Sequence, residues 1–178
     1  MTPGGLKIGQ TEFFWDDAQG WVLHSGQLLS IEQMPEELFV IVDAAMNDKH
    51  SKALDRMGIL DPDRRRLKFL KCNAGTFDFT PDIQNGAMQL EYVTCPERGR
   101  CSEEGHLCQP LLINGHKISM AELRIISLIR QGKYDKEICD ELSIAPQTLR
   151  THKQNIERKL NADRKVQVAL KAVEYGII

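Results

Sequence analysis

The chain has 178 residues, which is enough for one ordinary domain or for two small ones. Hydrophobic residues make up 42% and charged residues 27% of it, as in a protein with a packed core. No run approaches the roughly 18 apolar residues of a membrane-spanning helix, and the first residues lack the apolar segment of a secretory signal. We therefore expect a cytoplasmic protein with no membrane partner.

The charge of the chain is unevenly distributed. The net charge of −2 gives no hint of a nucleic-acid partner. Residues 1–116, however, carry 11 Lys and Arg against 17 Asp and Glu, a net of −6, whereas residues 117–178 carry 12 against 8, a net of +4. This asymmetry indicates that the two parts meet different partners, and the basic part is compatible with binding to DNA.

The N-terminal part is predicted to be a small α+β module. Short apolar runs broken by Asp, Gly and Ser over residues 11–33 predict two or three short strands or turns. Pro35, followed by two Glu, predicts the start of a helix, which apolar residues at helical spacing continue. A second short helix is expected from about Ser51 to Met57, ended by Gly58.

Further strands are expected before the C-terminal part. Residues 61–63 read as a turn, and the alternation of apolar residues over 67–79 favours a strand. A second strand is expected at 88–95, followed by a loop rich in Gly and charged residues. The predicted organisation is a cysteine-bearing module over residues 1–112, a linker at 113–117 and a second domain over 118–178.

Cysteines are crowded near the end of the first module. Three of the five cysteines lie within fourteen residues, and in a cytosolic chain such crowding favours a metal over disulfides. Thiolates could hold Zn²⁺ tetrahedrally or an iron–sulfur cluster, with His106 or His116 as a replacement ligand. A small core of reduced cysteines stays open as the alternative, and Cys139 is expected to be a packing residue. The predicted metal ligands are Cys72, Cys95, Cys101 and Cys108.

Helices are predicted throughout the C-terminal third. Ser119 and Glu122 have the spacing of a capping box, so a helix starts there and ends at Gly132. The last helix is expected over about residues 163–175. Its predicted inward residues are Val166, Leu170 and Val173.

The two middle helices carry the functional argument. Asp135 is expected to cap a helix over residues 136–142, and a short turn leads to a helix over 146–160 that Asn161 ends. A short helix, a tight turn and a longer helix with a polar face form the helix-turn-helix plan, whose second helix lies in the DNA major groove. The predicted outward residues of that helix are Gln147, Arg150, Thr151, Gln154 and Arg158, with Lys153 near the edge.

The same stretch resembles a known family. The residues Lys136-Glu137-Ile138, Leu142, Ile144, Thr148-Leu149-Arg150, His152, Asn155-Ile156, Lys159-Leu160 and Arg164 stand where the LuxR-type (GerE- or NarL-like) DNA-binding domain has its pattern. The resemblance covers residues 118–178, about a third of the chain. It implies a four-helix domain that binds short inverted repeats of double-stranded DNA as a homodimer, often through the last helix.

The resemblance also assigns residue roles. It places Gln147, Thr148, Arg150, Thr151 and Gln154 toward the groove, and makes Lys136, Lys153 and Arg158 candidates for phosphate contacts. The chain departs from the family pattern at four positions. These are Ala121 for Arg, Asp135 for Asn, Ala145 for the capping Ser and Asn161 for Gly.

Many regulators of this family carry a phospho-receiver domain, but the N-terminal pattern is not of that kind. Asp43 follows three apolar residues that read as helix rather than strand, and the βαβ alternation of a doubly wound domain is missing. We expect instead a module for a protein partner, for dimerisation or for sensing.

The leading interpretation is a sequence-specific transcription regulator. One alternative is a metal- or redox-sensing regulator whose cysteine cluster is the sensor. Another is a protein-interaction adaptor that keeps the helix-turn-helix fold without binding DNA. An enzyme is not indicated, because no nucleophile–base constellation, phosphate loop or pair of catalytic carboxylates stands out.

Overall fold

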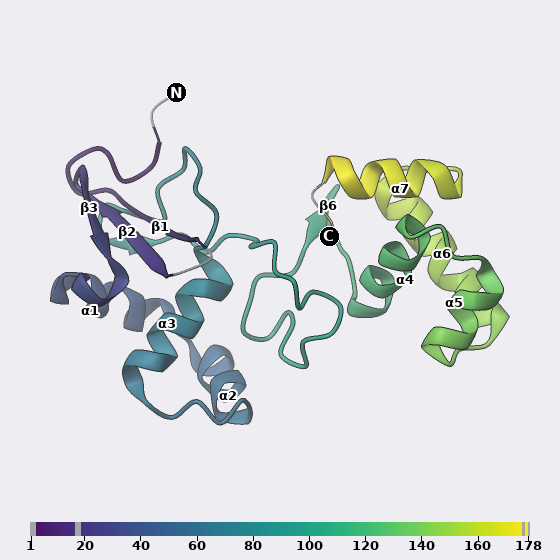
Figure 1. Ribbon diagram of the computed structural model, residues 1–178, viewed down its shortest axis with the longest axis horizontal. Helices are drawn as coiled ribbons and strands as arrows, with labels where there is room; N and C mark the ends of the chain where they lie inside the picture. Colours follow the sequence, from purple (N-terminus) through teal and green to yellow (C-terminus); the bar gives the residue numbers. More distant parts are fainter. Residues whose placement is uncertain (1–2, 17–18, 176, 178) are drawn as a thin grey trace. The chain divides into compact units, whose positions relative to one another are not determined.

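The computed structural model describes residues 3–16, 19–175 and 177. The chain forms two compact units (Figure 1). The first comprises Met1–Val93 with Gly105–Gln109, and the second Thr94–Glu104 with Pro110–Ile178. An α+β region with an antiparallel sheet is followed by a four-helix region, which confirms the predicted fold class. None of the described helices is long and apolar enough to cross a membrane.

The first unit contains a five-stranded antiparallel sheet in the order β3-β2-β1-β4-β5. Phe13 and Val22 pair across β1 and β2, and both are buried in the core. Ser25 and Gly26 have positive φ, which is the two-residue turn that joins twisted hairpin strands. The prediction of short strands in this region is confirmed. The strands are β1 (Thr11–Trp15), β2 (Gly20–His24), β3 (Gln27–Ser30), β4 (Ile83–Gln84) and β5 (Ala87–Met88).

Helices cover one side of this sheet (Figure 1). A short 3-10 turn, η1 (Ile31–Gln33), leads from the sheet into them. Leu38 and Val42 lie four residues apart on the first helix and are buried against the sheet, with Phe69 and Leu70 from the third. The helices are α1 (Glu36–Ala45), α2 (Asp48–Arg56) and α3 (Pro62–Asn73).

The structure corrects two predictions in this unit. Residues 67–79 were expected to favour a strand, but most of that stretch belongs to α3. The side chain of Asp61 accepts a hydrogen bond from the backbone N–H of Arg64 at 2.9 Å, and Pro62 occupies the first helical position. This N-cap arrangement starts a helix, so the residues read as a turn were its beginning. Of the strand expected at 88–95, only Met88 is in β5.

The sheet of the first unit is antiparallel, whereas the sheet of a doubly wound receiver domain is parallel. Asp43 lies on α1, and both of its carboxylate oxygens accept hydrogen bonds from the guanidinium of Arg66, at 2.7 and 2.8 Å. It therefore serves as a structural ion-pair partner between α1 and α3.

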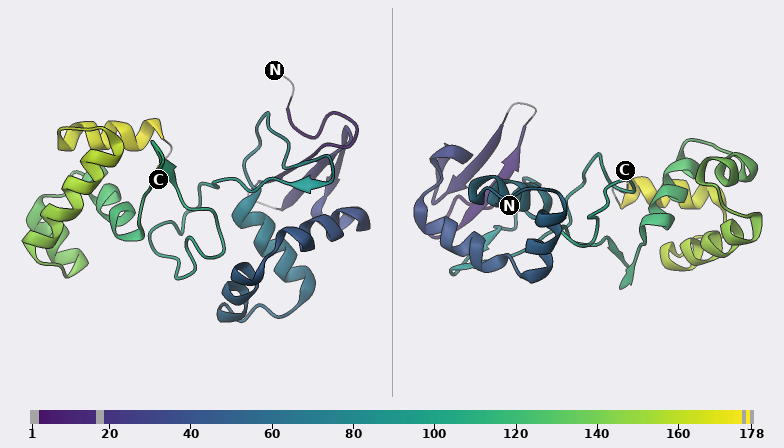
Figure 2. Two further views of the ribbon diagram at one scale, coloured as in Figure 1. Left: turned by 180° about the vertical axis from the view of Figure 1, so that it is seen from behind. Right: turned by 90° about the horizontal axis from the view of Figure 1, so that it is seen from below.

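The second unit begins its regular structure with a hairpin. Asn114 and Gly115 both have positive φ, as a type I′ turn requires. Residues 113–117, treated above as a linker, thus lie in this hairpin. Figure 2 shows the helices that follow it from two further sides. The elements are β6 (Leu112–Ile113), β7 (His116–Lys117), α4 (Met120–Arg130), α5 (Asp135–Leu142), α6 (Pro146–Leu160) and α7 (Lys165–Glu174).

A buried ion pair joins α4 to α6. The capping box of Ser119 and Glu122 forms as predicted. The Nζ of Lys159 lies 2.7 and 2.8 Å from the two carboxylate oxygens of Glu122, whose side chain is 3% exposed. Burial alone would raise the pKa of Glu122, but hydrogen bonds from Lys159 and Ser119 outweigh it and lower that pKa below its ordinary value.

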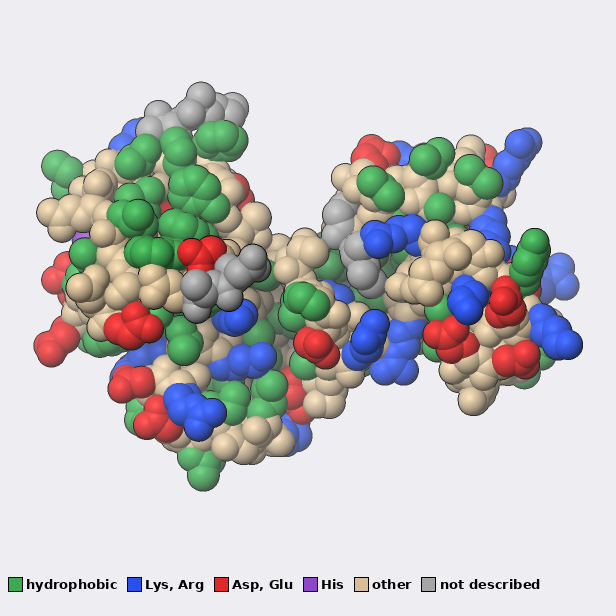
Figure 3. Space-filling view, in the orientation of Figure 1, with side chains coloured by type: hydrophobic (Ala, Val, Ile, Leu, Met, Phe, Trp, Pro, Cys, Tyr) green, Lys and Arg blue, Asp and Glu red, His purple; other side chains and the backbone are tan. Residues whose placement is uncertain are grey.

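The buried face of α7 differs from the prediction. Val166, Leu170 and Val173 were expected to point inward, but each is about two-thirds exposed. Val168 and Ala172, four residues apart, are buried instead. A residue two positions away lies about 200° around a helix, so burial of one set exposes the other. Figure 3 shows apolar side chains gathered over α7.

Candidate DNA interface

The helix pair α5 and α6 forms the predicted helix-turn-helix arrangement. An eight-residue helix and a fifteen-residue helix are separated by residues 143–145. Ser143 ends α5 in the left-handed conformation with φ of 52°, which redirects the chain sharply. Ile138 and Cys139 of α5 and Leu149 of α6 are buried, so Cys139 is a packing residue as expected. These apolar contacts fix the two helices to each other.

The polar face of α6 is open to solvent. The backbone bounds of this helix coincide with the predicted 146–160, and Asn161 ends it with φ of 51°. The hydroxyl of Thr151 donates a hydrogen bond to the carbonyl of Gln147 at 3.1 Å, which leaves its oxygen as an acceptor. Arginine, glutamine and threonine side chains are those that read base edges. The exposed residues on this face are Gln147, Thr148, Arg150, Thr151, Gln154 and Arg158.

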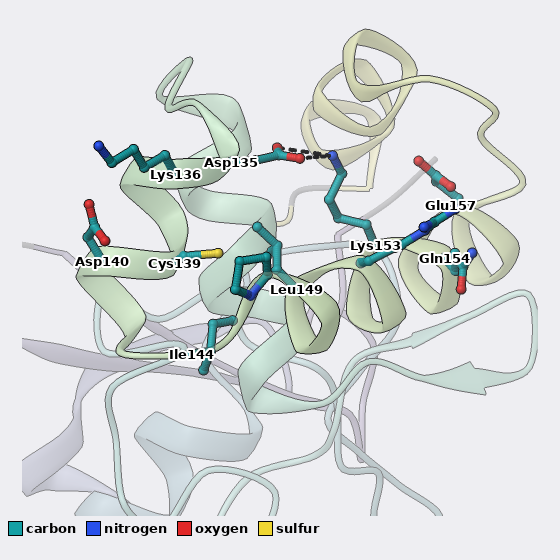
Figure 4. A pocket seen from close by; sticks show the side chains of 11 residues that line it. Asp135, Lys136, Cys139, Asp140, Ile144, Leu149, Lys153, Gln154 and Glu157 are labelled. Atoms are coloured by element: carbon teal, nitrogen blue, oxygen red, sulfur yellow. Dashed lines mark hydrogen bonds and ion pairs between the residues drawn. The ribbon is translucent and has the colours of Figure 1, made fainter.

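A groove of about 820 Å³ runs between α5 and α6 (Figure 4). Apolar walls are supplied by Cys139, Ile144, Pro146 and Leu149, and the other lining residues are polar or charged. The Nζ of Lys153 reaches across the groove to both carboxylate oxygens of Asp135, at 2.9 and 3.0 Å. The groove is lined by three basic residues, Lys136, Arg150 and Lys153, and by three acidic residues, Asp135, Asp140 and Glu157.

The backbone N–H groups at the N-terminus of α6 are a second kind of polar group at the candidate interface. Ala145 is the N-cap residue and has no side-chain oxygen, while Pro146 presets the first turn. The first backbone N–H groups of the helix therefore receive no hydrogen bond acceptor from the N-cap side chain. Together with the helix dipole, such groups favour an anion at this end of the helix.

Comparison with known proteins identifies this region. Residues 116–172 match the family described as "Bacterial regulatory proteins, luxR family". The second unit contains a LuxR-type helix-turn-helix DNA-binding domain. Residues 1–115 lie outside this match. A stretch of 60 residues, 34% of this chain, is 38% identical to the regulatory protein SdiA of Escherichia coli (strain K12) and covers 25% of that protein. The chain thus matches about a quarter of the length of this curated relative.

The LuxR-type domain departs from the predicted capping of α5. Asp135 was expected to be the N-cap, but Tyr134 holds that position and Asp135 is the first residue of the helix. The backbone N–H of Tyr134 donates to the Glu137 carboxylate at 2.6 Å, which ties down the start of the helix. The side chain of Asp135 is consequently directed at Lys153 of α6 (Figure 4). No local pattern predicts this pair, because 18 positions separate its members and no periodicity relates them.

The structure distributes the four predicted metal ligands over both units. Cys72, on α3, and Cys108 belong to the first unit, whereas Cys95 and Cys101 belong to the second. Each of the four side chains is partly buried. Within the part of the chain that the structure describes, no group of three or more His, Cys, Asp or Glu side chains is arranged to hold a metal ion. Metal binding by these cysteines stays a prediction.

The cysteine-bearing loop of the second unit is fixed to the LuxR-type domain. Arg98 and Glu104, both almost completely buried, form an ion pair at 3.6 Å. The other carboxylate oxygen of Glu104 accepts the N–H of Gly99 at 2.6 Å. The guanidinium of Arg124, on α4, donates to the carbonyl of Gly99. A segment without regular secondary structure is therefore held in place next to α4.

Proposed function

We propose that this protein is a sequence-specific transcription regulator that reads the major groove of double-stranded DNA with α6. The observation that carries the proposal is the solvent-exposed row of Arg, Gln and Thr along α6 within a LuxR-type domain. In a helix-turn-helix, this helix enters the groove while the preceding one lies against the backbone. A role in transcription implies a cytoplasmic location, with chromosomal DNA as the partner.

The contacts divide into two classes. Arg150 is the side chain best suited to a two-pronged contact with guanine, and Gln147 or Gln154 can do the same with adenine. Thr148 and Thr151 provide further contacts to base edges. Lys136 and Arg158 are proposed to reach phosphates, which contribute affinity but carry no sequence information, whereas the ammonium of Lys153 is paired with Asp135.

We also propose that the protein binds DNA as a homodimer through α7. The support is the exposed apolar stripe of Val166, Leu170 and Val173, at spacings of four and three residues on one helix face. A second copy of the same stripe would bury it, and twofold symmetry makes such a contact self-complementary. Two recognition helices would then read an inverted repeat.

Replacing Arg150 with Ala is expected to remove sequence-specific binding. Loss of one good base contact costs about 1–3 kcal/mol of discrimination, equivalent to a roughly 5- to 150-fold change per half-site. The target duplex is selected from random sequences with the full-length wild-type protein. Affinity for that duplex and for an unrelated one is then measured by fluorescence anisotropy, and sedimentation gives the stoichiometry, expected to be two chains per inverted repeat.

The matched control is Arg130→Ala, which removes the same charge from the exposed end of α4. This variant is expected to keep the wild-type ratio of specific to unrelated affinity. Wild-type affinity of Arg150→Ala for the selected duplex would contradict the assignment of α6. Failure of the wild-type protein to select any sequence, together with retained binding to a protein partner, would favour the adaptor function.

A second proposal is that the cysteine-rich segment binds zinc. Two of the sulfurs accept hydrogen bonds from the backbone. The N–H of Glu97 donates to Cys95 Sγ, with an N–S distance of 3.4 Å, and the N–H of Gly105 donates to Cys108 Sγ, with an N–S distance of 3.5 Å. Hydrogen bonds of this kind orient a cysteine sulfur as a potential metal ligand. We propose that the metal stabilises a segment that lacks a core of its own. We further propose that the first unit binds a protein partner or has a sensing role.

Elemental analysis of untagged full-length protein is expected to give about one zinc per chain. Removal of zinc by a chelator is expected to increase proteolysis within residues 94–109, because metal binding and folding are linked. Iron accompanied by visible absorption would instead support an iron–sulfur redox sensor. Protein free of both metals, with unchanged protease resistance after chelation, would contradict a metal role for these cysteines.

A further inference from the structure

The ion pair between Asp135 and Lys153 takes a cation out of the proposed interface. Lys153 extends along the α5–α6 groove toward the carboxylate, and only 23% of its side chain remains exposed (Figure 4). Asp135 is 58% exposed, so the pair lies at the mouth of the groove rather than in the core. Both carboxylate oxygens are within 3.0 Å of the same ammonium group. The ammonium is therefore already neutralised before any phosphate approaches.

This arrangement bears on DNA binding because a phosphate and a carboxylate compete for the same ammonium. An exposed ion pair is weak enough that one phosphate contact at moderate salt can compete with it for the ammonium. Asp135 also lies in the first turn of α5, where the helix dipole favours a negative charge. Its carboxylate is thus held next to Lys153 by the fold itself.

We propose that Asp135 is a positioning residue that holds Lys153 within the α5–α6 groove and withholds it from the DNA backbone. The proposal rests on the proposed DNA-binding function. Because phosphate contacts are independent of sequence, withholding one of them lowers affinity for all DNA equally. Binding then depends more on the base-reading residues of α6. Asp135 thereby helps to keep the affinity for non-specific DNA low.

The test is a double-mutant cycle on the full-length protein, read through salt dependence. Asp135→Asn preserves the size of the side chain and removes its charge, and Lys153→Gln removes the ammonium. Affinity for a random-sequence duplex is measured between about 50 and 200 mM salt for both single variants, the double variant and the wild type. One added phosphate contact steepens the slope of log K against log salt by about 0.9.

Lys153→Gln is expected to leave the slope unchanged in the wild-type background, because the lysine is not on a phosphate there. Asp135→Asn is expected to steepen the slope by about 0.9 and to raise affinity several-fold at low salt. The double variant is expected to return to the wild-type slope. Glu141→Gln removes the same charge from α5 at a position outside the groove, and is expected to change the slope by much less.

Equal flattening of the slope by Lys153→Gln in both backgrounds would overturn the proposal, since Lys153 would then already contact a phosphate in the wild type. A steeper slope in Asp135→Asn that persists in the double variant would also overturn it. Loss of DNA binding by every protein, wild type included, would instead identify a failure of the proposed function. If Asp135 had only a structural role, Asp135→Asn would change affinity without any change in the salt slope that depends on Lys153. That result would also overturn the proposal.

Discussion

Replacing Lys159 with Met is expected to destabilise the second unit by about 3–5 kcal/mol. The ammonium of Lys159 is the partner of Glu122, which is 3% exposed, and it also donates to the carbonyl of Lys117 at 2.8 Å. Methionine preserves the packing of the side-chain stem but leaves a buried carboxylate without its counter-ion. The effect is measured by hydrogen exchange of the backbone amides of α4 and α6, which reports this unit within the full chain.

The double variant Glu122→Gln with Lys159→Met is the matched control. Glutamine preserves the capping-box contact to Ser119 and carries no charge, so most of the stability lost in the single variant is expected to return. Equal destabilisation of both variants would show that the lost packing, rather than the unpaired charge, is responsible. A loss below about 1 kcal/mol in Lys159→Met would place the pair among ordinary surface ion pairs.

The pH dependence of the wild type follows from the same pair. The pKa of Glu122 is lowered in the folded state, so its contribution to stability is present above the unfolded pKa. That contribution is lost as the pH falls through the folded pKa, on the acidic side of the ordinary glutamate value of about 4.3.

Replacing Asp82 with Asn is expected to stabilise the first unit at neutral and alkaline pH. Burial raises the pKa of Asp82 to about 9, with the neighbouring carboxyls of Glu12, Glu91 and Asp78 adding to the effect. Burial likewise raises the pKa of Glu12 to about 7. Among the described residues, Oε2 of Glu12 is buried and finds no hydrogen-bond partner. The cluster therefore favours proton uptake on folding.

The direction of the pH effect follows from proton counts. The raised folded pKa means that the stabilising protonated form of Asp82 is fully present below the unfolded pKa, about 3.9. Stability is then lost as the pH rises toward about 9, by up to about 1.4 kcal/mol for each pH unit. Asparagine remains neutral at every pH. Its side-chain oxygen can still accept the hydrogen bond from the backbone N–H of Phe13, which lies 2.7 Å from Oδ2 of Asp82 in the wild type.

Tryptophan fluorescence during urea unfolding isolates this effect, because Trp15 and Trp21 both lie in the first unit. Asp82→Asn is expected to match the wild type near pH 4 and to exceed it increasingly toward pH 8. The control Asp48→Asn, at an exposed position in the first turn of α2, is expected to follow the wild-type pH profile. A parallel pH profile for Asp82→Asn would contradict the raised pKa.

The sequence predicted a helix correctly where its capping residue, the spacing of its apolar residues and its terminating residue all indicated the same helix. Ser119 and Glu122 predicted the beginning of α4, and Pro146 and Asn161 predicted both ends of α6. The exposed face of α6 followed from the same period, so the candidate base-reading residues could be named from sequence. Their contacts with DNA stay predictions. In α3 the local signal was present but misread, since Asp61 and Pro62 form a helix N-terminus.

The sequence by itself determined the helix-turn-helix unit, because its caps and its 3.6-residue period act between residues only a few positions apart. Tertiary structure alone decided which face of α7 is buried, since apolar residues occupy both faces and packing against α4 selects Val168 and Ala172. It also decided that Asp135 meets Lys153 and that Asp82 joins other carboxyls. Such pairings depend on how separate elements cross in space, which no local pattern encodes.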